Sequence, residues 1–367
     1  MEKISKFFLI LGIFTTPFYV FSSGSLQPSH FLLLLFAFFW VVYKKGFYVD
    51  RQLFLLSMPF FSYVILVNLV YSLYYQDPIF FSYPLNLVFD FIIIFTLTSC
   101  LKDLDGNQIK KIPYIMFAIL AMLFSLWLAG LGAYKFYPRY NGYFNDPNQM
   151  AFFVLCIATI ACLYIKNLIL YLLTIFLALS LILFTQSRSA IVGVVVLLSS
   201  LFFLYWKGSY KSIFISVFIL ILLLIFIFIF GDDVLKINYV QSVVGRFESA
   251  DLEEQSDVRG YTRILNFPEY LFFGAGQGLD KRFGSTVEIH STWAGIFFYY
   301  GIIGIFLFLF FLVNIFKKLT IYQKVLFLVP LMYSFSTFGA RTVIFWILVS
   351  CFYHAANFKN ANKKVLL

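Results

Sequence analysis

Charged residues are scarce in this chain of 367 residues: they make up 12% of it, against about a quarter in a soluble globular domain. Hydrophobic residues make up 62%, phenylalanine alone occurs 51 times, and the mean hydropathy is +0.90. Water cannot be the main solvent for such a composition. We therefore expect an all-α polytopic integral membrane protein.

Cysteine and histidine are also rare, with four and three copies. The cysteines lie in or beside apolar runs without C-x-x-C spacing, and we interpret them as small buried hydrophobic residues. Asp103-Leu-Asp105 resembles the start of a calcium loop but lacks its later Gly and Glu, so it indicates a turn. Gly274-Ala-Gly-Gln-Gly278 follows no strand, which argues against a dinucleotide site. We expect neither a metal nor a cofactor.

The apolar runs predict twelve membrane spans, or eleven if the two runs around Lys166 form one helix. Their approximate positions are 7–23, 30–43, 53–75, 82–101, 112–133, 148–165, 167–184, 189–206, 212–230, 289–316, 323–338 and 342–357. Residues 1–230 would hold nine spans, 231–288 a long outer loop with short helices, and 289–367 three spans and a cytoplasmic tail.

The net charge of +10 does not indicate nucleic-acid binding, because the basic residues form short clusters between spans. With a cytoplasmic N-terminus, 17 of the 27 basic residues fall in the inner loops. This bias predicts that both termini are cytoplasmic. The chain is therefore expected to lie in a membrane, with membrane lipids as partners and the long loop outside.

The long loop, 231–288, is too polar to lie in lipid, where its backbone groups would lack hydrogen-bond partners. Ser256 and Asp257 are suited to cap a helix over 257–267, which Pro268 then interrupts. Because this loop has no counterpart in the first half of the chain, an inverted-repeat transporter is disfavoured.

Arginine and lysine are divided between the two sides of the membrane. Among the 17 inner basic residues, 16 are lysines, whereas seven of the ten outer ones are arginines. The outer arginines are Arg139, Arg188, Arg246, Arg259, Arg263, Arg282 and Arg341. A guanidinium group matches phosphate or carboxylate oxygens two at a time, so we expect an anionic ligand at this face. The alternative is that these arginines pair with the acids of the loop and with lipid phosphates.

Asp146 and Pro147 fit the N-cap and first position of the sixth helix. Capping does not account for Arg139, nor for the flanking Asn145 and Asn148. A helix N-terminus beside an arginine favours a bound anion.

Two further residues are candidates for chemistry. Asp90 interrupts the fourth span, where an acid is either functional or a structural residue that is hydrogen-bonded or paired with an arginine. His290 lies two residues after Glu288, where the loop re-enters the membrane, and imidazole suits a general base. A lone histidine is more often structural, so that alternative stays open.

Several segments in this order resemble the bacterial O-antigen polymerase and ligase superfamily. They are Gly142-Tyr-Phe-Asn-Asp-Pro-Asn148, Thr185-Gln-Ser-Arg-Ser-Ala190, and the outer-loop series Arg259, Pro268, Gly274-Ala-Gly276, His290-Ser291 and Gly301-Ile-Ile-Gly304. One departure from the family pattern is Asp146, which stands between Asn145 and Pro147.

The resemblance implies a metal-independent membrane glycosyltransferase of the GT-C-like type, located in the bacterial inner membrane with the long loop in the periplasm. Its donor would be a glycan on undecaprenyl diphosphate, with Arg188 and Arg259 on the diphosphate and His290 assisting the acceptor hydroxyl. The resemblance favours a polymerase of O-antigen or capsule repeat units, which would work with a chain-length regulator and a flippase. The alternatives are an O-antigen ligase that transfers glycan to lipid A core, a lipid-linked oligosaccharide flippase, and a non-catalytic scaffold.

The predicted site combines the resemblance with the arginine pattern. Its catalytic members are His290, Arg259 and Glu288. Its diphosphate-binding members are Arg188, Arg139, Arg341, Arg263, Arg246, Asn145 and Asn148.

Overall fold

The computed structural model describes residues 1–21, 25–205, 259–284 and 288–358. Within these ranges the chain is helical and contains no strand, only the isolated bridges Ala133–Gly142 and Phe136–Arg139. The prediction of an all-α chain is confirmed for this part. The described residues form two compact units: unit 1 contains 1–111, 259–319 and 334–358, and unit 2 contains 112–205 and 320–333.

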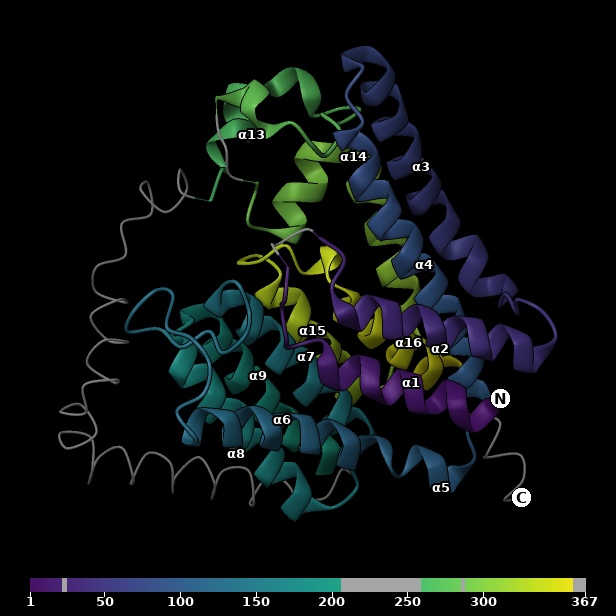
Figure 1. The fold of residues 1–367 in the computed structure, drawn as a ribbon, viewed down its shortest axis with the longest axis vertical. Coiled ribbons are helices and arrows are strands. Elements are labelled where there is room, and N and C mark those ends of the chain that lie inside the picture. The colour runs from purple at the N-terminus through teal and green to yellow at the C-terminus, as the bar shows by residue number, and fades with distance from the viewer. Residues whose placement is uncertain (22–24, 206–258, 285–287, 359–367) are drawn as a thin grey trace. The chain divides into compact units, whose positions relative to one another are not determined.

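Unit 1 is built around α4, which packs against α2, α3 and α16, while α3 also packs against α14 (Figure 1). Its helices are α1 (Glu2–Thr15), α2 (Pro28–Lys44), α3 (Arg51–Tyr75), α4 (Ile79–Asp103), α5 (Gly106–Ile109), α13 (Thr262–Asn266), α14 (Thr292–Lys317) and α16 (Val343–Phe358). Three single 3-10 turns accompany them: η1 (Pro268–Tyr270), η2 (Asp280–Phe283) and η3 (Gly339–Arg341).

Unit 2 is built around α7, which packs against α6, α8, α9 and α15. Its helices are α6 (Ile112–Leu128), α7 (Pro147–Tyr164), α8 (Leu168–Thr185), α9 (Arg188–Tyr205) and α15 (Ile321–Tyr333). Nearly every side chain of α7 is buried, because neighbouring helices cover it on all sides.

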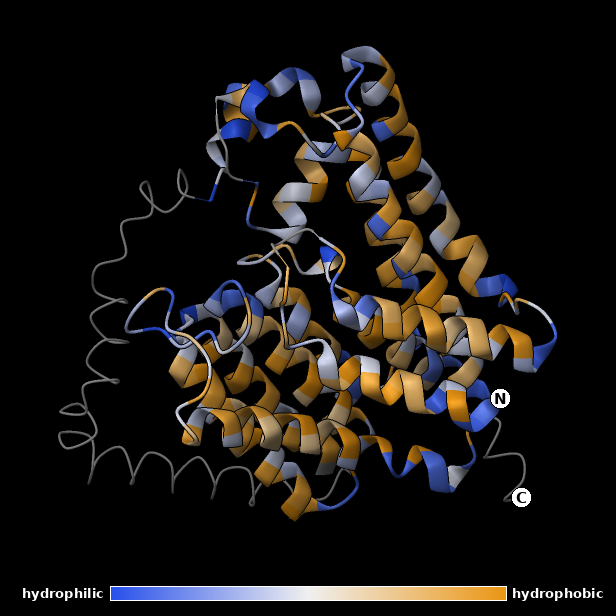
Figure 2. Ribbon diagram, in the orientation of Figure 1, coloured by the Kyte–Doolittle hydropathy of each residue, from blue (hydrophilic) through white to orange (hydrophobic). Residues whose placement is uncertain are grey.

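In the described part of the chain, six helices are long and apolar enough to cross a membrane. They are Arg51–Tyr75, Ile79–Asp103, Gly106–Leu128, Pro147–Tyr164, Leu168–Thr185 and Thr292–Lys317. Figure 2 shows hydrophobic residues along the helices of both units and hydrophilic residues around α13. Large apolar side chains such as Leu73 and Phe306 are exposed on these helices, as lipid contact would allow.

Each predicted span that falls in the described ranges overlaps a helix, whereas 212–230 lies outside them. The first span is shorter than expected, since α1 ends at Thr15. The fifth ends at Leu128 rather than 133, because Gly130 and Gly132 adopt positive φ angles of 69° and 101° that end the helix.

The helix expected over 257–267 is also shorter in the structure, where α13 spans Thr262–Asn266. Residues 259–261 form a turn, and α13 begins only at Thr262, because Gly260 has a φ of 72°. Ser256 and Asp257, the expected caps, lie outside the described residues. The helix does end before Pro268, as predicted.

Asp50 joins three helices at one end of unit 1. Its carboxylate caps α3 by accepting from the Leu53 amide at 2.9 Å, and it pairs with Lys102 of α4 at 2.5 Å. It also accepts from the Tyr353 hydroxyl of α16 at 2.5 Å. Burial opposes ionisation of this carboxyl, but the hydrogen bonds outweigh burial and lower its pKa.

The lowered pKa of Asp50 predicts acid sensitivity. The ionised form is favoured in the folded chain, so its stabilisation is complete above the unfolded pKa of about 4 and is lost as the pH falls through the lower folded value. Thermal midpoints measured in detergent across this range should fall more steeply for the wild type than for Asp50→Asn, which keeps a capping side chain. Asp77→Asn, at an exposed cap of α4, is the control and should follow the wild type.

Candidate functional site

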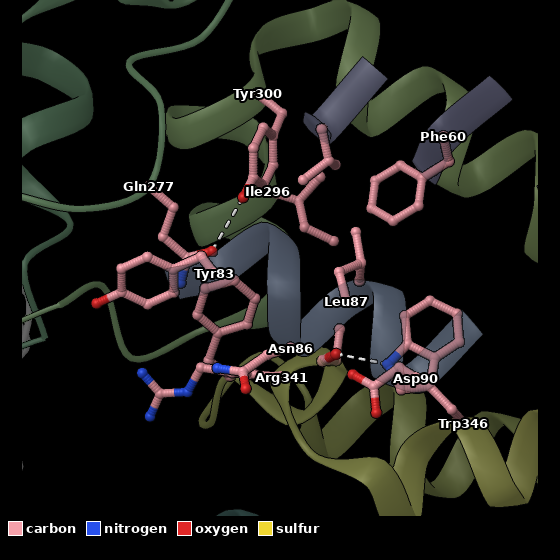
Figure 3. Close-up of a pocket in the computed structure, with 13 residues that line it drawn as sticks. Phe60, Tyr83, Asn86, Leu87, Asp90, Gln277, Ile296, Tyr300, Arg341 and Trp346 are labelled. Carbon is pink, nitrogen blue, oxygen red and sulfur yellow. Dashed lines mark hydrogen bonds between the residues drawn. The ribbon is translucent and has the colours of Figure 1, made fainter. Parts of the chain in front are cut away.

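Unit 1 contains a pocket where α3, α4, α14 and α16 meet η3 and the glycine-rich loop 274–278 (Figure 3). Its empty volume is about 440 Å³, including the solvent at its mouth. The lining residues are Phe60, Val64, Tyr83, Asn86, Leu87, Asp90, Gln277, Ile296, Tyr300, Phe338, Ala340, Arg341 and Trp346. The pocket thus combines apolar and aromatic walls with a few polar and charged groups, which is typical of ligand sites.

One face of α4 supplies a polar wall of this pocket. Tyr83, Asn86, Leu87 and Asp90 recur at three- and four-residue intervals, so they lie on the same side of the helix. Asp90 is about 16 Å from the start of α4 at Ile79, near the middle of the helix. It is 3% exposed, and no hydrogen bond or ion pair engages its carboxyl within the described ranges.

Arg341 and Glu288, two residues of the predicted site, form an ion pair. The other carboxylate oxygen of Glu288 accepts from the Tyr83 hydroxyl, so both oxygens are engaged. The two charged side chains are only 23% and 20% exposed. Burial lowers the pKa of Arg341 below its ordinary value, although a guanidinium stays protonated at neutral pH. A half-buried positive charge therefore borders the pocket and is held there by Glu288.

The loop 274–278 is fastened to α14 by a break in that helix. Gly301 has φ 65° and ψ −171°, and the Ile302 amide donates to the Leu271 carbonyl instead of to its own helix. The carbonyls of Phe298 and Tyr299, freed by the break, accept from the amides of Ala275 and Gly276 at 3.0 and 2.8 Å. Gly274 and Gly301 are thus explained by one close crossing of two backbones, whereas a Cβ at Gly276 would meet the Tyr71 ring at 2.6 Å.

The crossing carries Gln277 into the pocket. Its backbone amide donates to Asn68 of α3 at 3.0 Å, and its side-chain oxygen accepts from the Tyr300 hydroxyl at 3.0 Å. The side-chain nitrogen is buried without a hydrogen-bond partner among the described residues.

His290 and Arg259 are brought together through the main chain, because the His290 amide donates to the Arg259 carbonyl at 3.1 Å. The His290 side chain is exposed. Ser291, the next residue, caps α14 by accepting from the Ala294 amide at 3.3 Å. Unit 1 therefore holds all three residues that the sequence predicted to be catalytic.

Arg263 pairs with an acid of its own loop. Its guanidinium contacts Asp280 at 2.7 Å, and the Tyr299 hydroxyl donates to the same carboxylate oxygen at 2.7 Å. The Arg263 and Asp280 side chains are 4% and 9% exposed. This pairing is the alternative that the sequence left open for the outer arginines, and it ties α13 to α14.

Arg282 has a comparable internal role. It donates to the carbonyls of Ala275 and Gly276, and its guanidinium carbon lies 4.5–5.4 Å from the ring centres of Tyr71, Tyr75, Phe80 and Phe283. Cation–π contact with four rings holds the arginine against the loop that presents Gln277.

In unit 2 the structure brings together two motifs that the sequence singled out. The Arg139 guanidinium donates to the Asn148 side chain at 2.8 Å and to the Thr185 carbonyl at 3.0 Å, and so links the 142–148 segment to the turn after α8. Asp146 caps α7 and Pro147 is its first residue, as predicted. The Asn145 oxygen accepts from Lys135 at 3.1 Å.

Arg188 is the first residue of α9 and is half-buried. The neighbouring Ser187 hydroxyl is 2.9 Å from that of Tyr333, which also donates to the Asn148 carbonyl at 3.1 Å. Arg139, Asn145, Asn148 and Arg188 thus belong to unit 2, whereas Arg259, Arg263 and Arg341 belong to unit 1. Arg246 lies outside the described residues.

Sequence reasoning missed Tyr83, Asn86 and Gln277 as members of the pocket. The three-residue interval from Tyr83 to Asn86, continued by Asp90 four residues later, was a usable signal, because it places polar groups on one face of an apolar span. Nothing local marks Gln277, since its position depends on a backbone crossing with α14.

Within the described ranges, no group of three or more His, Cys, Asp or Glu residues is arranged to hold a metal ion. No protein-family model matches this chain, and no curated protein matches it.

Proposed function

We propose that this chain is a glycosyltransferase of the bacterial inner membrane that polymerises oligosaccharide repeat units carried on undecaprenyl diphosphate. The proposal includes twelve spans in a GT-C-like arrangement, cytoplasmic termini and a site open to the periplasm. Its main support is the unit 1 pocket, where a half-buried arginine and carboxylates are held between apolar helices beside the segment with His290. A chain-length regulator and a flippase would be its protein partners.

In the proposed reaction, an acceptor hydroxyl attacks the anomeric carbon of the donor sugar. The bond from that carbon to the diphosphate oxygen breaks, and its electron pair leaves with undecaprenyl diphosphate. Arg341 and Arg259 offset the negative charge on the leaving group. His290 takes the hydroxyl proton, since both oxygens of Glu288 are already engaged by Arg341 and Tyr83. Glu288 is then a positioning residue for Arg341.

A flippase is the transporter alternative, and broken membrane helices such as α14 are common in transporters. In those proteins the freed carbonyls line a path for ions or substrate. Here the carbonyls of Phe298 and Tyr299 are bonded to loop amides, so the break anchors a loop. This arrangement supports the transferase. Reconstituted vesicles that translocate lipid-linked oligosaccharide without lengthening it would instead favour the flippase.

A deletion strain separates polymerase from ligase. Without a polymerase, lipid A core should carry one repeat unit and no long chains. Without a ligase, all attached glycan should be lost while lipid-linked polymer accumulates. Purified chain that lengthens a lipid-linked donor by itself would exclude a scaffold role.

Substitution of His290 or Arg259 tests the assigned roles. In the complemented deletion strain, His290→Ala and Arg259→Ala should each reduce long-chain polysaccharide by about a hundredfold or more, as expected for loss of a general base or of an oxyanion-stabilising cation. Lys281→Ala, at an exposed position of η2, is the matched control and should support normal chains. Normal chain lengths in either variant at equal expression would refute the role of that residue.

A further inference from the structure

Two polar side chains that line the unit 1 pocket are buried and have hydrogen-bonding atoms without a partner among the described residues. The Asp90 side chain is 3% exposed and is engaged by no hydrogen bond within the described ranges. Gln277 is 5% exposed, and its side-chain nitrogen also has no partner there. Buried polar groups in folded proteins are normally hydrogen-bonded, so an acceptor and a donor left open in one pocket indicate a ligand that supplies the missing bonds.

The chemistry of the lining points to hydroxyl groups. Asp90 offers acceptors, and the amides of Asn86 and Gln277 offer both donors and acceptors. Arg341 is held by Glu288 beside Tyr83, about 10 Å along α4 from Asp90, so the Asp90 end of the described lining offers no positive charge to an anion such as diphosphate. A metal ion prefers several carboxylate or carbonyl ligands, whereas Asp90 is the single carboxylate among the described residues that line the pocket.

Aromatic rings also line the end of the pocket that contains Asp90. Trp346 and Phe60 lie on the same side of the pocket as Asp90, away from Arg341 and Tyr83 (Figure 3). The Trp346 ring is held in place because its nitrogen donates to the Ala340 carbonyl at 2.8 Å. Tyr83 and Asp90 are seven residues apart, or about 10 Å along α4, so the pocket extends from the charged pair to the rings. A ligand there would meet both hydrogen-bonding groups and apolar ring faces.

We propose that this pocket is a subsite for a neutral sugar ring, whose hydroxyl groups bond to Asp90, Asn86 and Gln277 and whose apolar face packs on Trp346. The inference rests on the proposed function for the role of the sugar as substrate, but not for its binding. Asp90 selects the sugar, because a ring without hydroxyls placed toward this carboxyl would leave it unbonded.

Saturation-transfer NMR on the full-length chain in nanodiscs tests the subsite. The probes are free glucose, galactose, mannose, N-acetylglucosamine and rhamnose. At least one should bind the wild type, and binding should weaken at least tenfold in Asp90→Ala and in Gln277→Ala. Asn314→Ala removes an exposed amide of α14 outside the pocket lining and should bind like the wild type. Because Asp90→Ala could disturb α4, equal thermal midpoints are required, and Gln277→Ala gives an independent reading from a loop.

Three outcomes would overturn the inference. The first is that no sugar binds the wild type. The second is that binding persists unchanged in both pocket variants. The third is that sodium or potassium ions, rather than sugars, shift the tryptophan fluorescence in an Asp90-dependent way.

The proposed function is tested separately by chain lengthening. Sugar binding through Asp90 without glycan lengthening would reject the polymerase but support the subsite. Glycan lengthening with an unchanged KM for the lipid-linked donor in both pocket variants would support the polymerase but reject the subsite.

Discussion

Gly301→Ala is expected to prevent accumulation of folded protein. A Cβ at this position would lie 2.2 Å from the Phe272 carbonyl oxygen, closer than any tolerated contact. The backbone angles of φ 65° and ψ −171° also belong to a region that essentially only glycine adopts. Strain and overlap each cost of order 1–3 kcal/mol, a large fraction of the stability of a typical protein. The measurement is the yield of monodisperse protein in detergent and its thermal midpoint.

Gly46→Ala is the matched control for this prediction. A Cβ at Gly46 would meet no atom of the described residues within 4 Å, and the φ of Gly46 is not positive, so the variant should accumulate and melt like the wild type. Gly274→Ala should repeat the defect of Gly301→Ala, since its Cβ would lie 2.4 Å from the Tyr299 carbonyl oxygen on the other side of the same crossing. Normal accumulation of either variant would contradict the docked arrangement of loop and helix.

Loss of Arg341 or Glu288 should have the second largest effect, and a double-mutant cycle separates its two components. Removing one partner leaves the other charge half-buried and unpaired, which should cost about 1–3 kcal/mol after allowance for the exposed fifth of the pair. Arg341→Gln should also lower glycan lengthening about a hundredfold, because it removes a cation from the leaving-group site.

The double variant Arg341→Gln and Glu288→Gln should recover most of the lost stability but none of the activity. Recovery of stability without recovery of activity would identify Arg341 as a group that acts on substrate and Glu288 as the residue that positions it. Thermal midpoints and lengthening rates of the four proteins provide the cycle. Recovery of activity in the double variant would show that both residues serve only the fold.

The local composition of the chain predicted most of its helices and one helix cap. Apolar runs predicted a helix wherever a span falls in the described ranges, and Asp146 with Pro147 predicted the start of α7. These features depend on nearby residues, so they can be read directly. The lengths of α1 and α6 were overestimated, because hydrophobicity continues past the residues at which the backbone turns.

The tertiary structure determines the role of each arginine. Sequence alone treated the outer arginines as one class, but Arg263 is buried against Asp280, Arg282 stacks on four rings, and Arg341 pairs with Glu288 at a pocket. A guanidinium has the same donors in all three places. Its role depends on which acids and rings the folding brings to it, and most of these partners are distant in sequence.

The amino-acid sequence by itself determined an apolar helical chain with polar groups gathered in a few segments, because side-chain hydrophobicity and backbone capping act over a few residues. Only the tertiary structure placed Asp90, Gln277 and Arg341 around one pocket. That placement requires a loop to cross a broken helix, and the crossing is made by backbone hydrogen bonds that leave no signature except glycine.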